Sequence, residues 1–230
     1  MIIKAVIFDC DGPLLDSFRA GLKRIKILCA IHDIPFGRTE RMRLTELWGL
    51  PGIELLEQGL LISKKLAQRM YPEWERIDLH DPLPLVPGAR EALFWLRKNN
   101  ITATLLTSRH RENLMEILDR LDLEREFSII ATKEDTQFHK PDPRVLWHTF
   151  EKLRETRIEK EQCIFVGDTP ADIETGRGAH TTTVVVQTGP YLLKHVAKHP
   201  VPIENIINSV DDLPIWVEEH HEGKLNFLYA

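Results

Sequence analysis

Short apolar segments of the sequence are followed by side chains that could do chemistry. Asp9 and Asp11 follow the first such segment with Cys10 between them, and Thr107 and Ser108 follow the second. Later segments are followed by one lysine and two further acids: Lys140, Asp168 and Asp172. Carboxylates without a His or Cys ligand set suit a hard cation such as Mg²⁺. With an ammonium and two hydroxyls, that cation would hold a phosphoryl group.

A carboxylate in such a set could itself attack phosphorus and form an aspartyl-phosphate. At ~4 Å and an effective dielectric constant of ~20, a carboxylate and a phosphomonoester dianion repel each other by ~8 kcal/mol. A cation and Lys140 would therefore be required for the attack. Asp11 could protonate the leaving oxygen and then take a proton from water.

The segments that position these side chains alternate between strand and helix patterns. The nearly all-apolar runs typical of buried parallel strands are residues 2–8, 102–106, 127–131, 163–166 and 182–186. Helical spacing recurs in two sets, Leu114, Ile117, Leu118 and Leu121, and Leu146, Phe150 and Leu153 after Pro143. This alternation predicts right-handed βαβ units and a mainly parallel sheet. Ligands of such sheets bind at the carboxyl ends of the strands, where the polar residues should meet.

One stretch lacks strand patterns. Phe18, Leu22, Ile25 and Cys29 form a helical stripe, and residues 53–70 form a long helical pattern. The proline-rich residues 81–88 then return the chain to the alternating part. We therefore expect a helical domain, residues 17–80, inserted into an α/β core of residues 1–16 and 81–230, with the proline segment as one hinge. Trp48 either shapes a substrate pocket or fills the core of the insertion.

Composition excludes several classes of protein. Hydrophobic residues make up 43% and charged residues 28% of the 230 residues, as in a folded globular chain. A net charge of −5 disfavours a broad nucleic-acid surface. Three cysteines without CxxC spacing favour a reducing cytosol over disulfides or zinc. The first apolar run is too short for a leader or a membrane span. We expect a cytoplasmic monomer or homodimer without nucleic-acid or membrane partners.

The four polar segments, in order, resemble the four motifs of the haloacid dehalogenase-type phosphohydrolases. Residues 8–17, FDCDGPLLDS, are similar to the start of phosphoglycolate phosphatase-like and beta-phosphoglucomutase-like members. Those members have a helical cap between the first and second motifs, where the insertion lies here. The resemblance extends from Ile3 to about Trp216 and implies a Rossmann-like α/β core with a helical cap. Pro13 and His180 depart from the pattern, which usually has Thr or Val and often Gly at these positions.

The resemblance implies a role for each polar residue. Asp9 would be the nucleophile, and Asp11 would be the general acid and base. The phosphoryl group would be bound by Cys10 through its backbone, Thr107, Ser108 and Lys140. Mg²⁺ would be bound by Asp9, the backbone carbonyl of Asp11, Asp168 and Asp172.

The implied function is a Mg²⁺-dependent phosphatase that hydrolyses a small phosphorylated metabolite through an aspartyl-phosphate, as phosphoglycolate phosphatases do. Cap closure would exclude water and select the substrate. A phosphomutase of the beta-phosphoglucomutase type is an alternative, although residues 45–48 lack the basic residue such mutases carry in the cap. A catalytically silent binding module is another. Arg109, His110 and Arg111 either steer an anionic substrate or form a solvated helix start.

Overall fold

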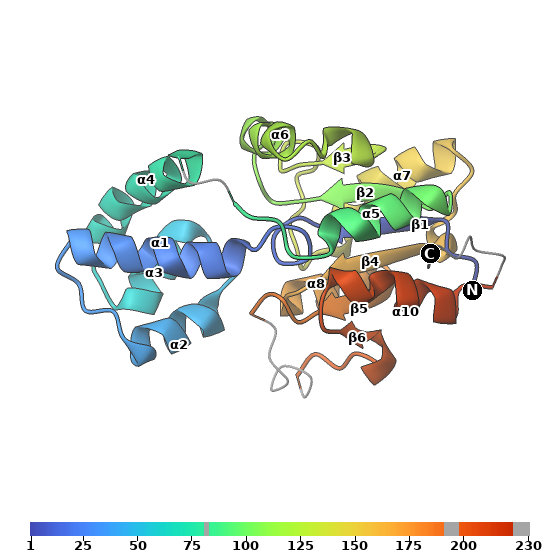
Figure 1. Cartoon of the computed structure of the whole chain (residues 1–230). Coiled ribbons are helices and arrows are strands. Elements are labelled where there is room, and N and C mark those ends of the chain that lie inside the picture. The colour runs from blue at the N-terminus through green and yellow to red at the C-terminus, as the bar shows by residue number, and fades with distance from the viewer. Residues whose placement is uncertain (81–82, 191–197, 223–230) are drawn as a thin grey trace. The chain divides into compact units, whose positions relative to one another are not determined.

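The computed structural model describes residues 1–80, 83–190 and 198–222 and divides into two compact units (Figure 1). The first unit comprises Met1–Leu15 and Leu85–Ala230, and the second comprises Asp16–Pro84. Asp81 and Pro82, part of the predicted hinge, lie outside the described residues. That the second unit acts as a cap stays a prediction.

The first unit contains a six-stranded parallel sheet, which confirms the α/β fold class. The strand order is β3-β2-β1-β4-β5-β6, and each neighbouring pair is parallel. The strands are β1 (Ala5–Asp9), β2 (Thr102–Leu106), β3 (Ile129–Ala131), β4 (Cys163–Gly167), β5 (Thr182–Val186) and β6 (Ile206–Ile207). β1 and β3 begin later than their apolar runs, because those runs begin in the preceding loops. β6 was not predicted, since two residues give no periodic pattern.

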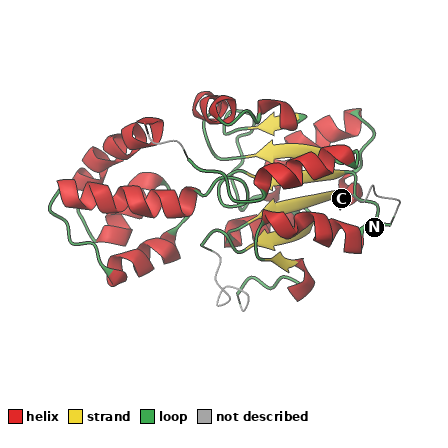
Figure 2. Cartoon of the chain, viewed as in Figure 1, coloured by secondary structure: helices red, strands yellow, loops and turns green. Residues whose placement is uncertain are grey.

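Helices cover both faces of this sheet (Figures 1 and 2). They are α5 (Ala89–Lys98), α6 (Arg111–Arg120), α7 (Trp147–Glu155), α8 (Pro170–Gly178) and α10 (Leu213–His220). α5 packs against α10 on one face, while α7 and α8 contact the strands on the other. Ile7 and Phe165 belong to a core cluster with Leu153 of α7. Burying each such side chain contributes about 1.5–3 kcal/mol, which ties the helix to the strands.

The predicted helix after Pro143 begins later than its pattern suggested. Pro143–Leu146 forms a short 3-10 helix, η2, and α7 follows it at Trp147. Asp142 caps η2, because its carboxylate accepts a hydrogen bond from the backbone N–H of Arg144 at 2.9 Å. The proline therefore stands at the first position of a 3-10 turn, where its missing N–H costs nothing.

The second unit is helical throughout its regular structure. Its helices are α1 (Ser17–Ile31), α2 (Arg38–Leu47), α3 (Gly52–Leu60) and α4 (Lys64–His80). The single helical pattern predicted for residues 53–70 is wrong, because Leu61 takes the left-handed conformation, with a φ of 55°, and ends α3. α2 was not predicted, because Leu44 is its one buried residue and the sequence therefore shows no apolar stripe at helical spacing.

Trp48 packs inside this helical unit. Its ring meets Phe18 edge to face at 5.0 Å between centroids and lies 6.3 Å from the ring of Trp74. A Cβ at Gly21 would overlap the Trp48 ring. Of the two interpretations of Trp48, these contacts favour the core of the insertion.

The chain leaves and re-enters the first unit at adjacent points. Leu15 forms an antiparallel bridge with Leu85, and the N–H of Val86 donates to the carbonyl of Leu14 at 2.8 Å. These bonds fix the loop after β1 to the start of the returning segment. Among the described residues, no helix is both long enough and apolar enough to cross a bilayer.

Candidate active site

Strand register places the predicted site residues along one edge of the sheet. Asp9, the last residue of β1, lies opposite Leu106, so Thr107 follows directly beside it. On the other side of β1, Phe8 lies opposite Val166. The loops that carry the polar residues therefore leave neighbouring parallel strands at their carboxyl ends, where ligands of such sheets bind.

Lys140 joins the acid that ends β1 to an acid of α8. Its ammonium lies 2.9 Å from Asp9 Oδ2 and 2.7 Å from Asp172 Oδ1. The Lys140 side chain is 12% exposed and that of Asp172 is fully buried. The backbone N–H of Cys10 donates to Asp9 Oδ1 at 2.8 Å, so both oxygens of Asp9 have a donor. Three of the four polar segments thus meet at one charged cluster.

Asp172 is held by the helix start that carries it. Thr169 is the N-cap of α8 and Pro170 follows at its first position. The Thr169 hydroxyl donates to Asp172 Oδ2 at 2.6 Å, and the N–H groups of Asp168 and Thr169 donate to the same oxygen. Sequence reasoning missed Thr169, although a Thr followed three residues later by an acid is a capping-box pattern. The cap leaves Asp172 Oδ1 for Lys140.

Asp168 lies between two glycines that have no room for side chains. A Cβ at Gly12 or at Gly189 would overlap the Asp168 carboxyl. The hydroxyl of Thr188 donates to the carbonyl of Gly12 at 2.7 Å, which joins the loop after β5 to the loop after β1. Asp168 Oδ1 is buried and accepts no hydrogen bond within the described part of the chain. This orphaned oxygen is a free ligand position.

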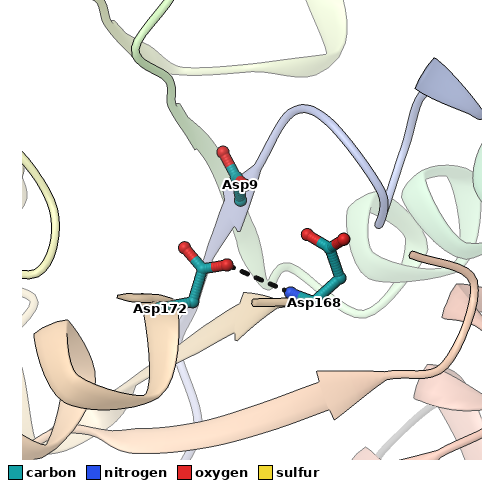
Figure 3. A group of neighbouring side chains, drawn as sticks. All are labelled: Asp9, Asp168 and Asp172. Atoms are coloured by element: carbon teal, nitrogen blue, oxygen red, sulfur yellow. Dashed lines mark hydrogen bonds between the residues drawn. The ribbon is translucent and has the colours of Figure 1, made fainter. Parts of the chain in front are cut away.

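Asp9, which ends β1, and the acids Asp168 and Asp172, which follow β4, gather in one group (Figure 3). One oxygen of each lies within 4.8 Å of the others. Burial raises the pKa of Asp9 to about 7 against the attraction of Lys140, and it raises the pKa of Asp168 well above the usual range. Burial alone would lower the pKa of Lys140, but Asp172 and Asp9 outweigh it and raise that pKa.

The charge of this group fits a divalent cation. Three carboxylates face one ammonium, so full ionisation leaves two negative charges unbalanced. The donors are all oxygens and one of them is orphaned, as hard cations such as Mg²⁺ require. The residues present therefore fit the expected metal.

The residues that follow β2 and β3 share a small cavity. It measures about 10 Å³, room for about one water, and its lining includes Thr107, Ser108 and Lys140. Thr107 is buried and Ser108 is exposed. The Thr107 hydroxyl oxygen accepts the N–H of Arg109 at 3.1 Å, which leaves its proton free to donate elsewhere. Three of the four predicted phosphate-binding residues thus line the cavity, while the fourth, Cys10, donates its backbone N–H to Asp9 Oδ1.

Asp11 forms a two-point ion pair with Arg109. Arg109 Nε lies 2.8 Å from Asp11 Oδ2, and Arg109 Nη2 lies 2.6 Å from Asp11 Oδ1. His110 pairs with Glu134, and Arg111 pairs with Asp135. Because each member of the predicted cationic cluster has a carboxylate partner, its steering of distant anions is weakened. Sequence reasoning singled out Arg109 but missed its contact with Asp11.

The two departures from the family pattern have local explanations. Pro13 lies in a turn closed by hydrogen bonds from Gly12 N to Leu15 O and from Leu15 N to Cys10 O, so its missing N–H is not needed. His180 follows α8 with a φ of 56°, a left-handed conformation that Gly adopts without strain.

Comparison with known proteins now identifies the family. The model of the haloacid dehalogenase-like hydrolase family matches residues 6–186, and the chain belongs to that family. A phosphorylated carbohydrates phosphatase of Thermotoga maritima is 26% identical over 92% of this chain and all of its own length. A phosphoglycolate phosphatase of Mesorhizobium japonicum is 32% identical over 93% of this chain and 94% of its own.

The fold has matching solved structures. The structure of a haloacid dehalogenase-like hydrolase from Bacteroides fragilis matches this fold with a TM-score of 0.75 and 21% sequence identity. The match covers 92% of this chain and 99% of the Bacteroides chain. Family membership, with relatives named phosphatases, confirms that the chain is an enzyme, a phosphoric monoester hydrolase. It is therefore not a silent binding module.

Proposed function

We propose that the protein is a cytoplasmic, Mg²⁺-dependent phosphatase that hydrolyses a small phosphorylated metabolite through an aspartyl-phosphate on Asp9. One observation carries this proposal: Lys140 bridges Asp9 and Asp172 at 2.9 and 2.7 Å. A buried ammonium beside the acid that ends β1 offsets the repulsion between that acid and an incoming phosphoryl dianion. The names of the two relatives favour small phosphorylated metabolites, such as phosphoglycolate or phosphorylated carbohydrates, as substrates.

In the first step, an Asp9 oxygen attacks phosphorus and the bond from phosphorus to the leaving oxygen breaks. The leaving oxygen takes the proton of a protonated Asp11, so the products are an alcohol, the aspartyl-phosphate and the Asp11 carboxylate. Lys140, the Thr107 hydroxyl and the N–H of Ser108 would hold the phosphoryl oxygens. Lys140 is held by Asp9 and Asp172 before substrate arrives, as electrostatic stabilisation requires.

In the second step, water attacks the phosphorus and gives a proton to the Asp11 carboxylate. The bond between phosphorus and the Asp9 oxygen breaks, which restores the Asp9 carboxylate and releases phosphate. Asp11 thus returns to its protonated form, and the two steps together consume one water. The ion pair with Lys140 favours the restored carboxylate as leaving group.

Asp9, Asp168, Asp172 and the backbone carbonyl of Asp11 are the proposed holders of Mg²⁺. When bound, the cation would neutralise charge on the phosphoryl oxygens and on the attacking carboxylate. The orphaned Asp168 Oδ1 and the clustering of three carboxylates support this assignment.

The test is hydrolysis of p-nitrophenyl phosphate with Mg²⁺, with EDTA and by variants. We expect activity that needs Mg²⁺, and a loss of at least roughly 10³-fold in Asp9→Asn because the nucleophile is gone. Asp119→Asn, which changes an exposed acid on α6, is the matched control and should keep wild-type activity. Substantial activity in Asp9→Asn would remove the nucleophile assignment.

A phosphomutase would use the same first step and return the phosphoryl group to a sugar. Incubation with beta-glucose 1-phosphate and its bisphosphate separates the two functions. The proposed phosphatase releases inorganic phosphate, whereas a mutase yields glucose 6-phosphate.

A further inference from the structure

The loops after β1 and β2 are joined by one side-chain contact at the edge that carries the site. Arg109 binds Asp11 through two nitrogens, at 2.8 and 2.6 Å, each on a different carboxylate oxygen. Such a fork fixes the plane of the carboxylate as well as its distance, which a lysine ammonium cannot do. The Asp11 side chain is therefore held in one orientation.

Arg109 is itself fixed to the site. Its N–H donates to Thr107 Oγ1 at 3.1 Å, so its backbone follows the hydroxyl proposed to bind the phosphoryl group. The Arg109 side chain is 23% exposed and the Asp11 side chain 31%, so water surrounds neither of them fully. A contact this sheltered loses less to solvent screening than a surface ion pair.

The neighbouring cations have other partners. His110 lies 2.6 Å from Glu134, Arg111 lies 2.5 Å from Asp135, and Lys140 lies between Asp9 and Asp172. Arg109 makes its fork with Asp11, whereas these three cations contact other carboxylates.

We propose that Arg109 is a positioning residue for Asp11, which it orients toward the water that attacks the aspartyl-phosphate. This inference rests on the proposed function. The fork fixes the plane of the Asp11 carboxylate, and with it the directions from which its oxygens can accept a proton from water. A misplaced base costs roughly 10²-fold in rate, so loss of the fork should slow this step by about that factor.

The two chemical steps can be measured separately with p-nitrophenyl phosphate as substrate, because p-nitrophenolate leaves without needing a proton. In single-turnover experiments, Arg109→Gln should form the aspartyl-phosphate at close to the wild-type rate. Its decay should be slower by roughly 10²-fold. In the steady state, kcat should fall and KM should not rise. Arg109→Lys should restore part of the decay rate, because an ammonium can make one of the two contacts.

A double-mutant cycle tests whether Arg109 acts through Asp11. In an Asp11→Asn background, Arg109→Gln should add little further loss of decay rate, because the residue it positions is already disabled. Arg97→Gln on α5, which removes an exposed ion pair with Glu126, is the matched control and should leave both steps unchanged.

The outcomes that overturn the inference differ from those that overturn the proposed function. A rise in KM with unchanged decay would make Arg109 a substrate-binding residue. Wild-type decay in both Arg109 variants, or a full additional loss in the Asp11→Asn background, would end the positioning role. Failure of the wild-type enzyme to form a hydroxylamine-sensitive phosphoenzyme would instead refute the aspartyl-phosphate itself.

Discussion

Asp172 holds the ammonium of Lys140 at 2.7 Å, slightly closer than Asp9 does at 2.9 Å. Asp172 is fully buried and its other oxygen accepts three hydrogen bonds from Thr169 and Asp168. The acid on α8 therefore anchors the lysine, and the lysine in turn holds the carboxylate that ends β1. The position of the proposed nucleophile depends on the start of a helix that is remote in sequence.

The first prediction concerns the loss of the shared cation. Lys140→Met should lower the unfolding free energy of the metal-free protein by about 3 kcal/mol near neutral pH, because it leaves buried carboxylates uncompensated. kcat should fall by roughly 10²–10³-fold, the usual effect of removing a donor to a developing charge. Urea unfolding and steady-state kinetics measure the two effects. Lys152→Met, which loses only an exposed pair with Glu155, is the control, and an equal stability loss there would contradict the argument.

The second prediction concerns metal and pH. Burial raises the folded-state pKa of Asp9 from 3.8 to about 7, so between these values the folded state holds more protons than the unfolded state. Asp9 therefore lowers the stability of the metal-free protein as pH rises from about 4 to about 7. Mg²⁺ should raise the Tm more at about pH 7.5 than at about pH 5, because it binds the carboxylate form. Equal shifts in thermal unfolding at the two pH values would contradict this.

The third prediction concerns the glycine beside Asp168. Gly189→Ala should weaken Mg²⁺ binding, because the added methyl group would overlap the Asp168 carboxyl and turn it away. Titration calorimetry with Mg²⁺ alone measures this without relying on activity. Gly37→Ala is the control, since its added Cβ would make an ordinary contact of 3.5 Å with Glu40. Wild-type affinity in Gly189→Ala would show that the close approach does not position Asp168.

The fourth prediction concerns the cap of α8. Thr169→Val keeps the shape of the side chain but loses the hydroxyl that binds Asp172, and it should cost about 1–2 kcal/mol of stability. kcat should also fall, because Asp172 Oδ1 would no longer be fixed for Lys140. Thr156→Val, at the end of α7, also removes a hydroxyl but should leave kcat unchanged. A Thr169→Val enzyme with reduced stability and full kcat would limit the role of Thr169 to folding.

Much of the fold could be predicted because its strands are buried on both faces. β2 and β5 coincide with their apolar runs, and the polar residues that follow β1 and β4 lie where the sheet ends. Patterns could not predict the break between α3 and α4, because Leu61 in the left-handed region carries no sequence signal. β6 is too short to show a period, and α2 presents too few apolar residues.

The site could be predicted by its residues but not by its contacts. Strand ends predict which side chains share an edge, and the structure brings Asp9, Lys140, Asp168 and Asp172 together there. Which cation meets which acid depends on rotamers and loop geometry. The fork from Arg109 to Asp11 therefore emerged only from the structure.

The bridge between Leu15 and Leu85 joins the two points at which the chain leaves the α/β unit and returns to it. The residues between these two leucines form an insertion whose two ends meet at one point of the α/β unit. If a short linker replaced this insertion, the α/β unit should still fold and bind Mg²⁺. The helical insertion could then be exchanged for another without changing the residues of the proposed site.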